Sequence, residues 1–259
     1  MEIKGKKAVV FGGASGMGRA SAELLAARGA EVAVLDRPES AGAEVAAAFG
    51  GSFHPVDVTD FEATEGALDA AVDALGGLHV SITTAGGGTV KRTLGRGGPH
   101  DLETFRRVLD LNAVATFNIS RLAAAHMSRN EPEDPEDPET TGERGVIITT
   151  SSIAAFEGQV GQVAYSAAKA AIAGMCLTMA RDLGSLGIRV LAIAPSLFET
   201  GATDRIPAET RAALVKGAAF PRRLGRPEEY AKLALAVVDN PMLNGQCLRL
   251  DAGQRFGPK

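Results

Sequence analysis

The chain has 259 residues, of which 45% are hydrophobic and 22% are charged. These proportions indicate one large α/β domain over residues 1–259 rather than two small ones. The net charge is −4, and because residues 130–142 hold six acidic side chains and no basic one, the rest of the chain is close to neutral. That balance excludes the basic stripe of a protein that binds nucleic acid.

The cysteines and the most apolar stretch limit the cellular compartments that we expect for this protein. Cys176 and Cys247 each stand alone in apolar sequence, which favours neither a disulfide framework nor a thiolate metal site and suits a reducing cytoplasm. Residues 164–180 are apolar but are interrupted by Lys169, so we expect them to be too polar for a membrane span. A strand-like run begins within a few residues of Met1, so we expect no targeting peptide and a cytoplasmic location.

Six apolar runs, and a third strand that reaches residues 55–60, predict the seven strands of one sheet. The runs are continuous rather than alternating, as in strands that are covered on both faces. They lie at residues 7–11, 31–36, 79–84, 145–150, 188–195 and 246–251. Alanine-rich helical patterns separate them, for instance at about residues 16–28 and from Glu39 onward. This alternation predicts a single-domain α/β fold of the Rossmann class, with a doubly wound, mostly parallel, seven-stranded sheet and helices on both faces.

One segment departs from this alternation. Residues 130–144 begin with the sequence NEPEDPEDPETTG, which is acidic and spaced by prolines. Such a composition is typical of a solvated excursion. We therefore predict an acidic surface loop between a helix that ends near Arg129 and the strand that begins near Gly145.

The first strand ends in a glycine-rich turn. Gly12, Gly16 and Gly18 stand in the sequence FGGASGMGRA. Glycines at this spacing let the backbone turn tightly into a helix and approach a pyrophosphate at the helix N-terminus. The same spacing also occurs in an ordinary strand-to-helix turn, so the turn alone is a weak signal.

The ends of the second and third strands strengthen the case for a nucleotide. Asp36 closes the second strand, where a carboxylate can accept hydrogen bonds from both adenosine ribose hydroxyls. This charge would repel a 2′-phosphate, so it favours NAD over NADP, although Arg37 follows directly and Asp36 could instead cap a helix. The third strand reaches residues 55–60, where Asp57 and Val58 are candidates to bracket the adenine.

Tyr165 and Lys169 are four residues apart in an alanine-rich helical pattern, so they share one helix face. A nearby ammonium favours the phenolate and lowers the pKa of the tyrosine, as a general base for an alcohol proton requires. Packing of a tyrosine beside a snorkelling lysine would give the same pattern.

Two polar residues complete the candidate centre. Ser152 stands at the carboxyl end of the fifth strand, where its hydroxyl can hold a carbonyl or alcohol oxygen. Asn112 lies in an otherwise apolar helical pattern. It can hold a water that relays a proton, or it can be a core amide that the backbone satisfies.

Together these motifs resemble the short-chain dehydrogenase/reductase family over nearly the whole chain. The matching positions are Phe11, Gly12, Gly16 and Gly18 in the turn; Thr83, Ala85 and Gly86 after the fourth strand; Asn112, Ser152, Tyr165 and Lys169 in the centre; and Pro195, Ser196 and Thr200 after the sixth strand. Three of these residues depart from the family pattern, because Phe11 replaces threonine, Thr83 replaces asparagine and Ser196 replaces glycine. None of the three departures removes a reacting group.

The resemblance implies an NAD-dependent oxidoreductase that interconverts a secondary alcohol and a ketone. It implies catalytic roles for Asn112, Ser152, Tyr165 and Lys169. The implied cofactor contacts are Gly12, Ser15, Gly16, Met17, Gly18, Asp36, Asp57, Val58, Ala85, Gly86, Tyr165, Lys169, Pro195, Leu197 and Thr200. The implied substrate contacts are Ser152, Gln159, Gln162, Tyr165 and Phe198.

Within the family, residues 154–169 and 180–200 look most like the type-2 3-hydroxyacyl-CoA dehydrogenases, which also act on some hydroxysteroids. This similarity implies an acyl-CoA thioester substrate and a homotetramer. The loop at residues 86–100 carries Lys91, Arg92 and Arg96, which are candidates to meet CoA phosphates, although charged loops are usually only solvated.

Three alternatives stay open at this point. The first two are an NADP-dependent 3-oxoacyl-carrier-protein reductase and a hydroxysteroid dehydrogenase, which would use the same chemistry. The third is a non-catalytic nucleotide-sensing protein of the same fold. The joint presence of Asn112, Ser152, Tyr165 and Lys169 argues against the third.

Overall fold

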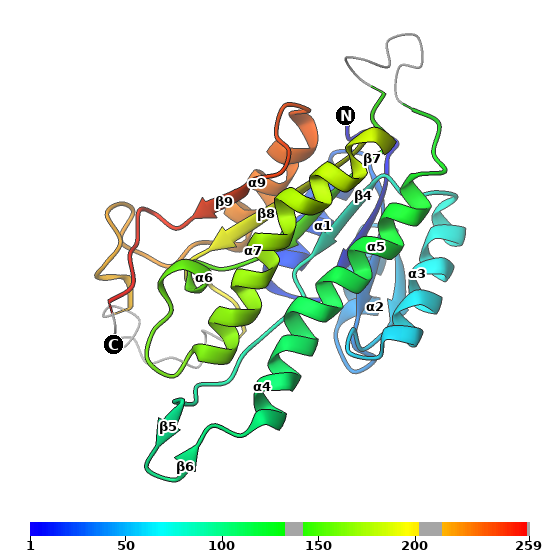
Figure 1. The fold of residues 1–259 in the computed structure, drawn as a ribbon. Helices are drawn as coiled ribbons and strands as arrows, with labels where there is room; N and C mark the ends of the chain where they lie inside the picture. The colour runs from blue at the N-terminus through cyan, green and yellow to red at the C-terminus, as the bar shows by residue number, and fades with distance from the viewer. Residues whose placement is uncertain (133–141, 202–213, 258–259) are drawn as a thin grey trace.

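The computed structural model describes residues 1–132, 142–201 and 214–257. The chain alternates strands and helices in the order β1 (Lys7–Phe11), α1 (Gly16–Ala27), β2 (Glu31–Asp36), α2 (Gly42–Ala48), β3 (Ser52–Pro55), α3 (Phe61–Leu75), β4 (Val80–Thr83), β5 (Leu94–Gly95), β6 (Gly98–Pro99), α4 (Leu102–Leu109), α5 (Ala115–Met127), β7 (Gly145–Thr150), α6 (Ala154–Glu157), α7 (Val163–Leu183), β8 (Ile188–Pro195), α9 (Pro227–Asp239) and β9 (Cys247–Leu250). A π-helical turn, Asp110–Val114, joins α4 to α5. Figure 1 shows these elements around one sheet.

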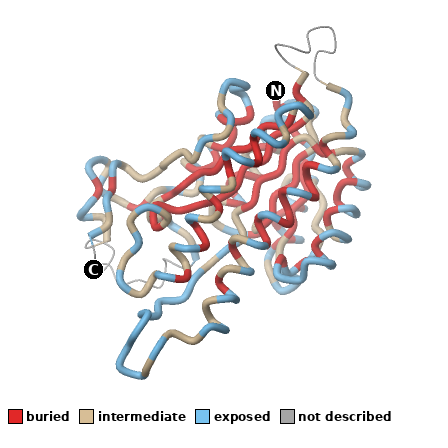
Figure 2. The backbone as a smooth tube through the Cα atoms, in the orientation of Figure 1, coloured by how far each residue is buried: buried red, intermediate tan, exposed pale blue. Residues whose placement is uncertain are grey.

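Seven strands form a parallel sheet in the order β3-β2-β1-β4-β7-β8-β9. Strands β4, β7 and β8 are buried along their whole length, because helices cover both faces (Figure 2). This arrangement confirms the predicted Rossmann class. The order reverses between β1 and β4, and such a switch point is where open α/β sheets bind ligands.

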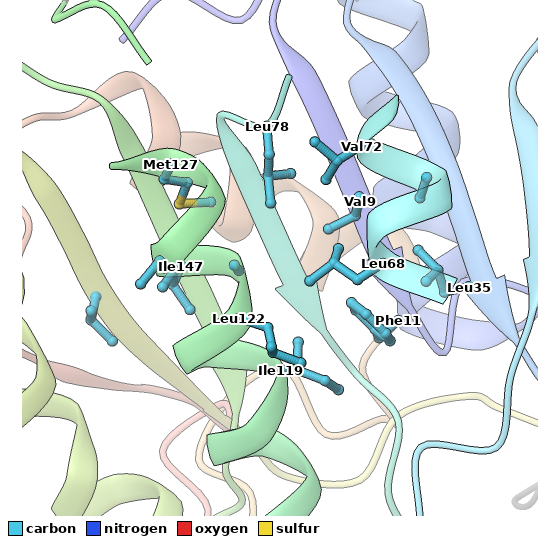
Figure 3. Close-up of a cluster of buried hydrophobic side chains, with 14 of the residues drawn as sticks. Val9, Phe11, Leu35, Leu68, Val72, Leu78, Ile119, Leu122, Met127 and Ile147 are labelled. Atoms are coloured by element: carbon cyan, nitrogen blue, oxygen red, sulfur yellow. The ribbon is translucent and has the colours of Figure 1, made fainter. Parts of the chain in front are cut away.

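Two hydrophobic clusters hold the helices to the sheet. One joins α3, α5 and α7 to one face through residues such as Phe11, Leu68 and Ile119 (Figure 3). The other joins α1, α2 and α9 to the opposite face through residues such as Val34 and Tyr230. Burial on this scale supplies most of the driving force for folding.

Local chemistry moves several boundaries from their predicted places. The second helix begins at Gly42 rather than Glu39, because residues 37–40 form a turn in which Ser40 Oγ donates to the Arg37 carbonyl at 2.7 Å. The third strand ends at Pro55, after which Asp57 accepts the backbone N–H of Thr59 at 2.9 Å. The loop at residues 86–100 contains a short hairpin, β5–β6, that projects from the body (Figure 1).

The predicted acidic loop lies mostly outside the described residues, which stop at 132 and resume at 142. Its two ends are tied together in the part that is described. Asn130 Nδ2 donates to the Arg144 carbonyl at 2.8 Å, and Arg144 Nε donates to the Asn130 carbonyl at 2.9 Å. The buried Glu143 then pairs with Arg189 at 2.7 Å.

Helix α7 is more apolar than the sequence analysis expects. Among the described residues, Val163–Leu186 is one helical stretch that is long and apolar enough, by length and composition, to cross a membrane. Its inner face nevertheless packs on the sheet, where Ile172 and Cys176 are buried in the first cluster. A core helix passes the same test of composition, so this test does not by itself indicate a membrane span.

Candidate active site

A cleft of about 900 Å³ opens where β1, β2, β4, β7 and β8 end. Fourteen of the predicted site residues line it. They are Gly12, Ser15, Gly16, Met17, Asp36, Asp57, Val58, Ala85, Gly86, Ser152, Tyr165, Lys169, Pro195 and Thr200. The fold therefore brings together residues from seven separate segments of the chain, at residues 12–17, 36, 57–58, 85–86, 152, 165–169 and 195–200.

The glycine-rich turn forms the floor of this cleft with backbone atoms. Gly12 has φ +77°, and a Cβ on it would lie 2.6 Å from the Ala85 nitrogen, so a larger residue would push the turn away from the loop after β4. Ser15, at the N-cap of α1, makes no side-chain capping bond, which leaves the first N–H groups of the helix available to an anion. Gly18 lies underneath, where a Cβ would collide with the Gly12 carbonyl.

An acidic corner lies at the end of β2. Asp36 Oδ2 accepts the Ala14 N–H at 2.9 Å, and its Oδ1 accepts the Arg37 N–H at 2.8 Å, so two backbone groups fix the carboxylate toward the turn. The Arg37 guanidinium pairs with Glu39 at 3.0 Å. Hydrogen bonds from the hydroxyl and N–H of Thr59 lower the pKa of Asp57. The Arg37 guanidinium therefore pairs with Glu39, and its charge also helps to lower the pKa of Asp57.

Tyr165 and Lys169 lie on the first two turns of α7 and point into the same end of the cleft. Lys169 Nζ is 5.6 Å from the centroid of the Tyr165 ring and donates to the Thr150 carbonyl at 2.9 Å. Ser151 Oγ donates to the Lys169 carbonyl at 2.8 Å, which ties α7 to the end of β7. The lysine is only 3% exposed.

The pKa values in this structure differ from the sequence-based expectation. Burial raises the pKa of Tyr165 above its ordinary value, and a hydrogen bond with Ser152 only partly opposes this rise. Burial also lowers the pKa of Lys169 to about 8. Proximity to an ammonium was expected to lower the tyrosine pKa, whereas the loss of hydration on burial is the largest cause and raises it.

Asn112 lies behind the cleft rather than on its wall. It is fully buried in the π-helical turn, where Nδ2 donates to the carbonyls of Gly87 at 2.7 Å and Val108 at 2.8 Å. Its Oδ1 accepts the Gly87 N–H at 3.2 Å. This geometry matches the alternative of a backbone-satisfied amide, and a role in a water relay stays a prediction.

The remaining predicted residues lie outside this cleft. Phe198 is 5% exposed and packs in the second cluster, with Gly225 against its ring; it contacts the core where a substrate contact was predicted. Leu197 is half-buried beside it and accepts the Gly225 N–H at 2.9 Å. Gln159 and Gln162 line a separate hollow of about 390 Å³ with the C-terminal residues 254–257. These four assignments remain to be tested.

The structure adds residues that the sequence did not single out. Thr84, Thr150, Leu111 and Arg107 all line the cleft. Thr84 directly follows the last residue of β4, and Thr150 is the last residue of β7. Their positions were therefore open to prediction from the rule that parallel strands end at one edge. Arg107 projects from α4, and no local pattern marks it.

The wall fits a dinucleotide. It combines a helix N-terminus for a pyrophosphate, an oriented carboxylate for a ribose and a lysine beside Gly86, where a Cβ would lie 3.1 Å from Lys169 Nζ. Within the described ranges, no group of three or more His, Cys, Asp or Glu side chains is arranged to hold a metal ion.

Comparison with known proteins agrees with this arrangement. The family model described as short chain dehydrogenase matches residues 6–211. The 3-hydroxyacyl-CoA dehydrogenase type-2 of Drosophila melanogaster is 46% identical and aligns with 99% of this chain and 100% of its own length. A crystal structure of 3-hydroxyacyl-CoA dehydrogenase type-2 from Mycobacterium avium is 39% identical, with a TM-score of 0.92 over 98% of both chains. A 7α-hydroxysteroid dehydrogenase complexed with NADH and 7-oxo glycochenodeoxycholic acid is 29% identical, with a TM-score of 0.86 over 100% of this chain and 97% of its own.

Proposed function

Because the chain belongs to the short-chain dehydrogenase family, we propose that this oxidoreductase uses NAD to interconvert a 3-hydroxyacyl-CoA and a 3-oxoacyl-CoA. The observation that carries the chemical part is the placement of Tyr165 beside Ser152 and Lys169 at the end of β7. The observation that carries the choice of cofactor is the Asp36 carboxylate, which two backbone N–H groups aim at the cleft.

The residues that would hold the dinucleotide come from both sides of the switch point. The turn at residues 12–17 receives the pyrophosphate, Asp36 receives the adenosine ribose, and Lys169 receives the nicotinamide ribose. When bound, the nicotinamide supplies the hydride acceptor for alcohol oxidation and the hydride donor for ketone reduction. Glu39 pairs with Arg37, so the guanidinium of the residue after Asp36 is partly neutralised and does little to attract a 2′-phosphate.

The chain's own residues move the proton. In the oxidising direction, Tyr165 Oη accepts the proton of the substrate hydroxyl while Ser152 Oγ holds the substrate oxygen. In the reducing direction, the same phenol donates its proton to the carbonyl oxygen. Lys169 holds a positive charge 5.6 Å from the phenol ring, which favours the phenolate against the cost of burial. Positioning of the substrate in the cleft supplies a further share of the rate.

The acyl-CoA assignment is supported by the names of the relatives and by the β5–β6 hairpin. Arg96 is exposed in the turn of this hairpin and Arg92 is exposed just before it, whereas Lys91 forms an ion pair with Asp101. Cations in such a position can meet the phosphates of CoA while the thioester reaches Tyr165. A hydroxysteroid substrate is the second candidate, because the structural relative that holds NADH also holds a bile-acid ketone.

We also propose a cytoplasmic homotetramer. Helices α5 and α7 present exposed apolar side chains, among them Phe117 at 47%, Val163 at 41% and Leu177 at 47%. Such a surface is typical of contact with another chain. Size-exclusion chromatography with light scattering tests this assembly, and a monomer at assay concentrations would contradict it.

An absorbance assay of the reduced nicotinamide tests the proposed function. The purified chain is given 3-hydroxyacyl-CoA esters, hydroxysteroids and simple secondary alcohols, each with NAD and with NADP. We expect the highest kcat/KM for a 3-hydroxyacyl-CoA with NAD. A higher kcat/KM for a steroid would move the assignment to the second candidate, and a preference for NADP would contradict the role given to Asp36.

A further inference from the structure

Tyr230 is the largest fully buried side chain of the described residues, and its polar end lies beside the active site. It belongs to α9, which packs on the face of the sheet opposite α7. Its hydroxyl lies 2.7 Å from Thr150 Oγ1 at the end of β7. A buried phenol needs a hydrogen-bond partner. Here the partner is Thr150, which also lines the active-site cleft.

The direction of this hydrogen bond follows from the contacts of Thr150. A threonine hydroxyl has one hydrogen, and Thr150 Oγ1 donates it to the Thr83 carbonyl at 2.6 Å. Tyr230 must therefore be the donor and Thr150 Oγ1 the acceptor. Burial raises the pKa of Tyr230 well above its ordinary value, so the phenol keeps the proton that it donates.

Thr150 connects this chain of hydrogen bonds to the other face of the sheet. Alternate residues of a strand share a face, so the Thr150 side chain lies on the same face of β7 as Val146 and Ile148. Those two residues pack in the cluster on the α9 side. The Thr150 backbone carbonyl accepts the ammonium of Lys169, which reaches it from α7, at 2.9 Å. One residue thus joins the α9 tyrosine to the active-site lysine.

We propose that Tyr230 is a positioning residue for the reaction, which fixes Thr150 so that the Thr150 carbonyl holds the Lys169 ammonium beside Tyr165. This inference rests on the proposed function, in which Lys169 supports proton transfer by Tyr165. The Lys169 ammonium donates to the Thr150 backbone carbonyl and lies over the Tyr165 ring, and Asn112 Oδ1 lies close to the same side of Gly86. Among these three groups only the Tyr165 phenol titrates, so the Thr150 carbonyl is a principal partner of the buried charge.

The first measurement compares kinetic constants. Tyr230→Phe removes the hydroxyl and keeps the ring, so we expect kcat to fall about fivefold, as for loss of one hydrogen bond, with little change in the KM for the hydroxy substrate. Thr150→Val should lower kcat similarly, and Thr150→Ser, which keeps the hydroxyl, should restore it. In the double variant Tyr230→Phe/Thr150→Val the two losses should not add, because both break one chain of bonds.

The second measurement needs no cofactor or turnover. In the nucleotide-free protein, nuclear magnetic resonance of isotope-labelled lysine side chains follows the titration of Lys169, which Lys169→Met identifies by removing its signal. The wild-type midpoint is expected near 8. In Tyr230→Phe the midpoint should move lower, because a less firmly held carbonyl stabilises the ammonium less.

A matched control separates positioning from stability. Leu235→Ala removes a buried side chain from the same helix and cluster and should lower the melting temperature without changing kcat or the Lys169 midpoint. If Tyr230→Phe leaves both of these quantities at their wild-type values, the inference is wrong. If the wild type turns over none of the substrates, the proposed function fails, and the Lys169 midpoint still decides whether Tyr230 positions the lysine.

Discussion

The two sides of the active site are built in different ways. On the nucleotide side, the cleft wall consists of strand ends and a glycine-rich turn, so its shape follows from the backbone of β1, β2 and β4. On the side of the β5–β6 hairpin, the structure offers exposed side chains and the separate hollow around Gln159 and Gln162. The first side is fixed by the fold, whereas the second depends on the particular side chains of this chain.

The catalytic centre around Tyr165 and Lys169 is also fixed by the fold, although it acts through side chains. Lys169 and Tyr165 are held by α7, and α7 is tied to β7 through Ser151 and Thr150. A residue whose position the fold fixes should show a large and specific effect when it is changed. A hairpin residue should show a small effect that is confined to one part of the substrate.

The largest effect is expected from Tyr165→Phe. This substitution removes the ionisable oxygen and keeps the ring, so we expect kcat to fall by about 10³-fold, in the range for loss of a general acid or base. Binding of the reduced nucleotide, followed by its fluorescence, should change little. Turnover close to that of the wild type would remove Tyr165 from the proton path.

The next prediction concerns the buried charge of Lys169. Its pKa falls from 10.5 to about 8 on burial, which at 1.36 kcal/mol per unit makes the charged form cost about 3 kcal/mol in the folded state. Lys169→Met should therefore unfold at higher urea concentration than the wild type at neutral pH, while losing activity.

The pH dependence gives the sign of this effect. Between about pH 8 and 10.5 the unfolded chain binds the proton that the folded chain has lost, so the wild type gains stability relative to Lys169→Met as the pH rises through this window. Below pH 8 the wild type keeps its full loss of unfolding free energy relative to Lys169→Met. Urea unfolding of both proteins at several pH values checks this, and a constant difference across the window would contradict a depressed lysine pKa.

The sequence predicted most of the strands, the glycine-rich turn and the helix face that line the cleft, for a physical reason. Apolar runs, the glycine spacing and the four-residue interval from Tyr165 to Lys169 are local patterns, and local patterns determine strands, turns and shared helix faces. The family and the Rossmann fold followed from them and are confirmed. The pKa direction of Tyr165 did not follow, because burial depends on elements that are distant in the chain.

Cross-strand pairing places two of the departures from the family pattern side by side. Phe11 and Thr83 look unrelated along the chain, but they are directly opposite each other in the β1–β4 ladder. Phe11 fills the first cluster, and the buried Thr83 hydroxyl has no hydrogen-bond partner within the described residues. The two replacements therefore occupy one site in the core, which only the register reveals.

A smaller effect is expected at Asp36. Asp36→Asn keeps an acceptor for the Ala14 N–H and removes the charge, so we expect the ratio of kcat/KM with NAD to that with NADP to fall about tenfold, as for one modest charge contact. Glu44→Gln, which removes a negative charge from α2, is the matched control and should leave the ratio unchanged. An unchanged ratio in Asp36→Asn would place the ribose elsewhere.

The smallest effect is expected on the hairpin. The double variant Arg92→Ala/Arg96→Ala should raise the KM for a 3-hydroxyacyl-CoA about threefold at low salt, with kcat unchanged, because exposed ion pairs contribute little and are screened by salt. A thioester of the same acid that lacks the nucleotide part of CoA should keep its KM. Arg181→Ala, at the far end of α7, is the control for a general loss of positive charge. An equal rise in KM for both thioesters would show that the hairpin shapes the acyl site instead, and the two sides of the cleft would then differ less than their construction suggests.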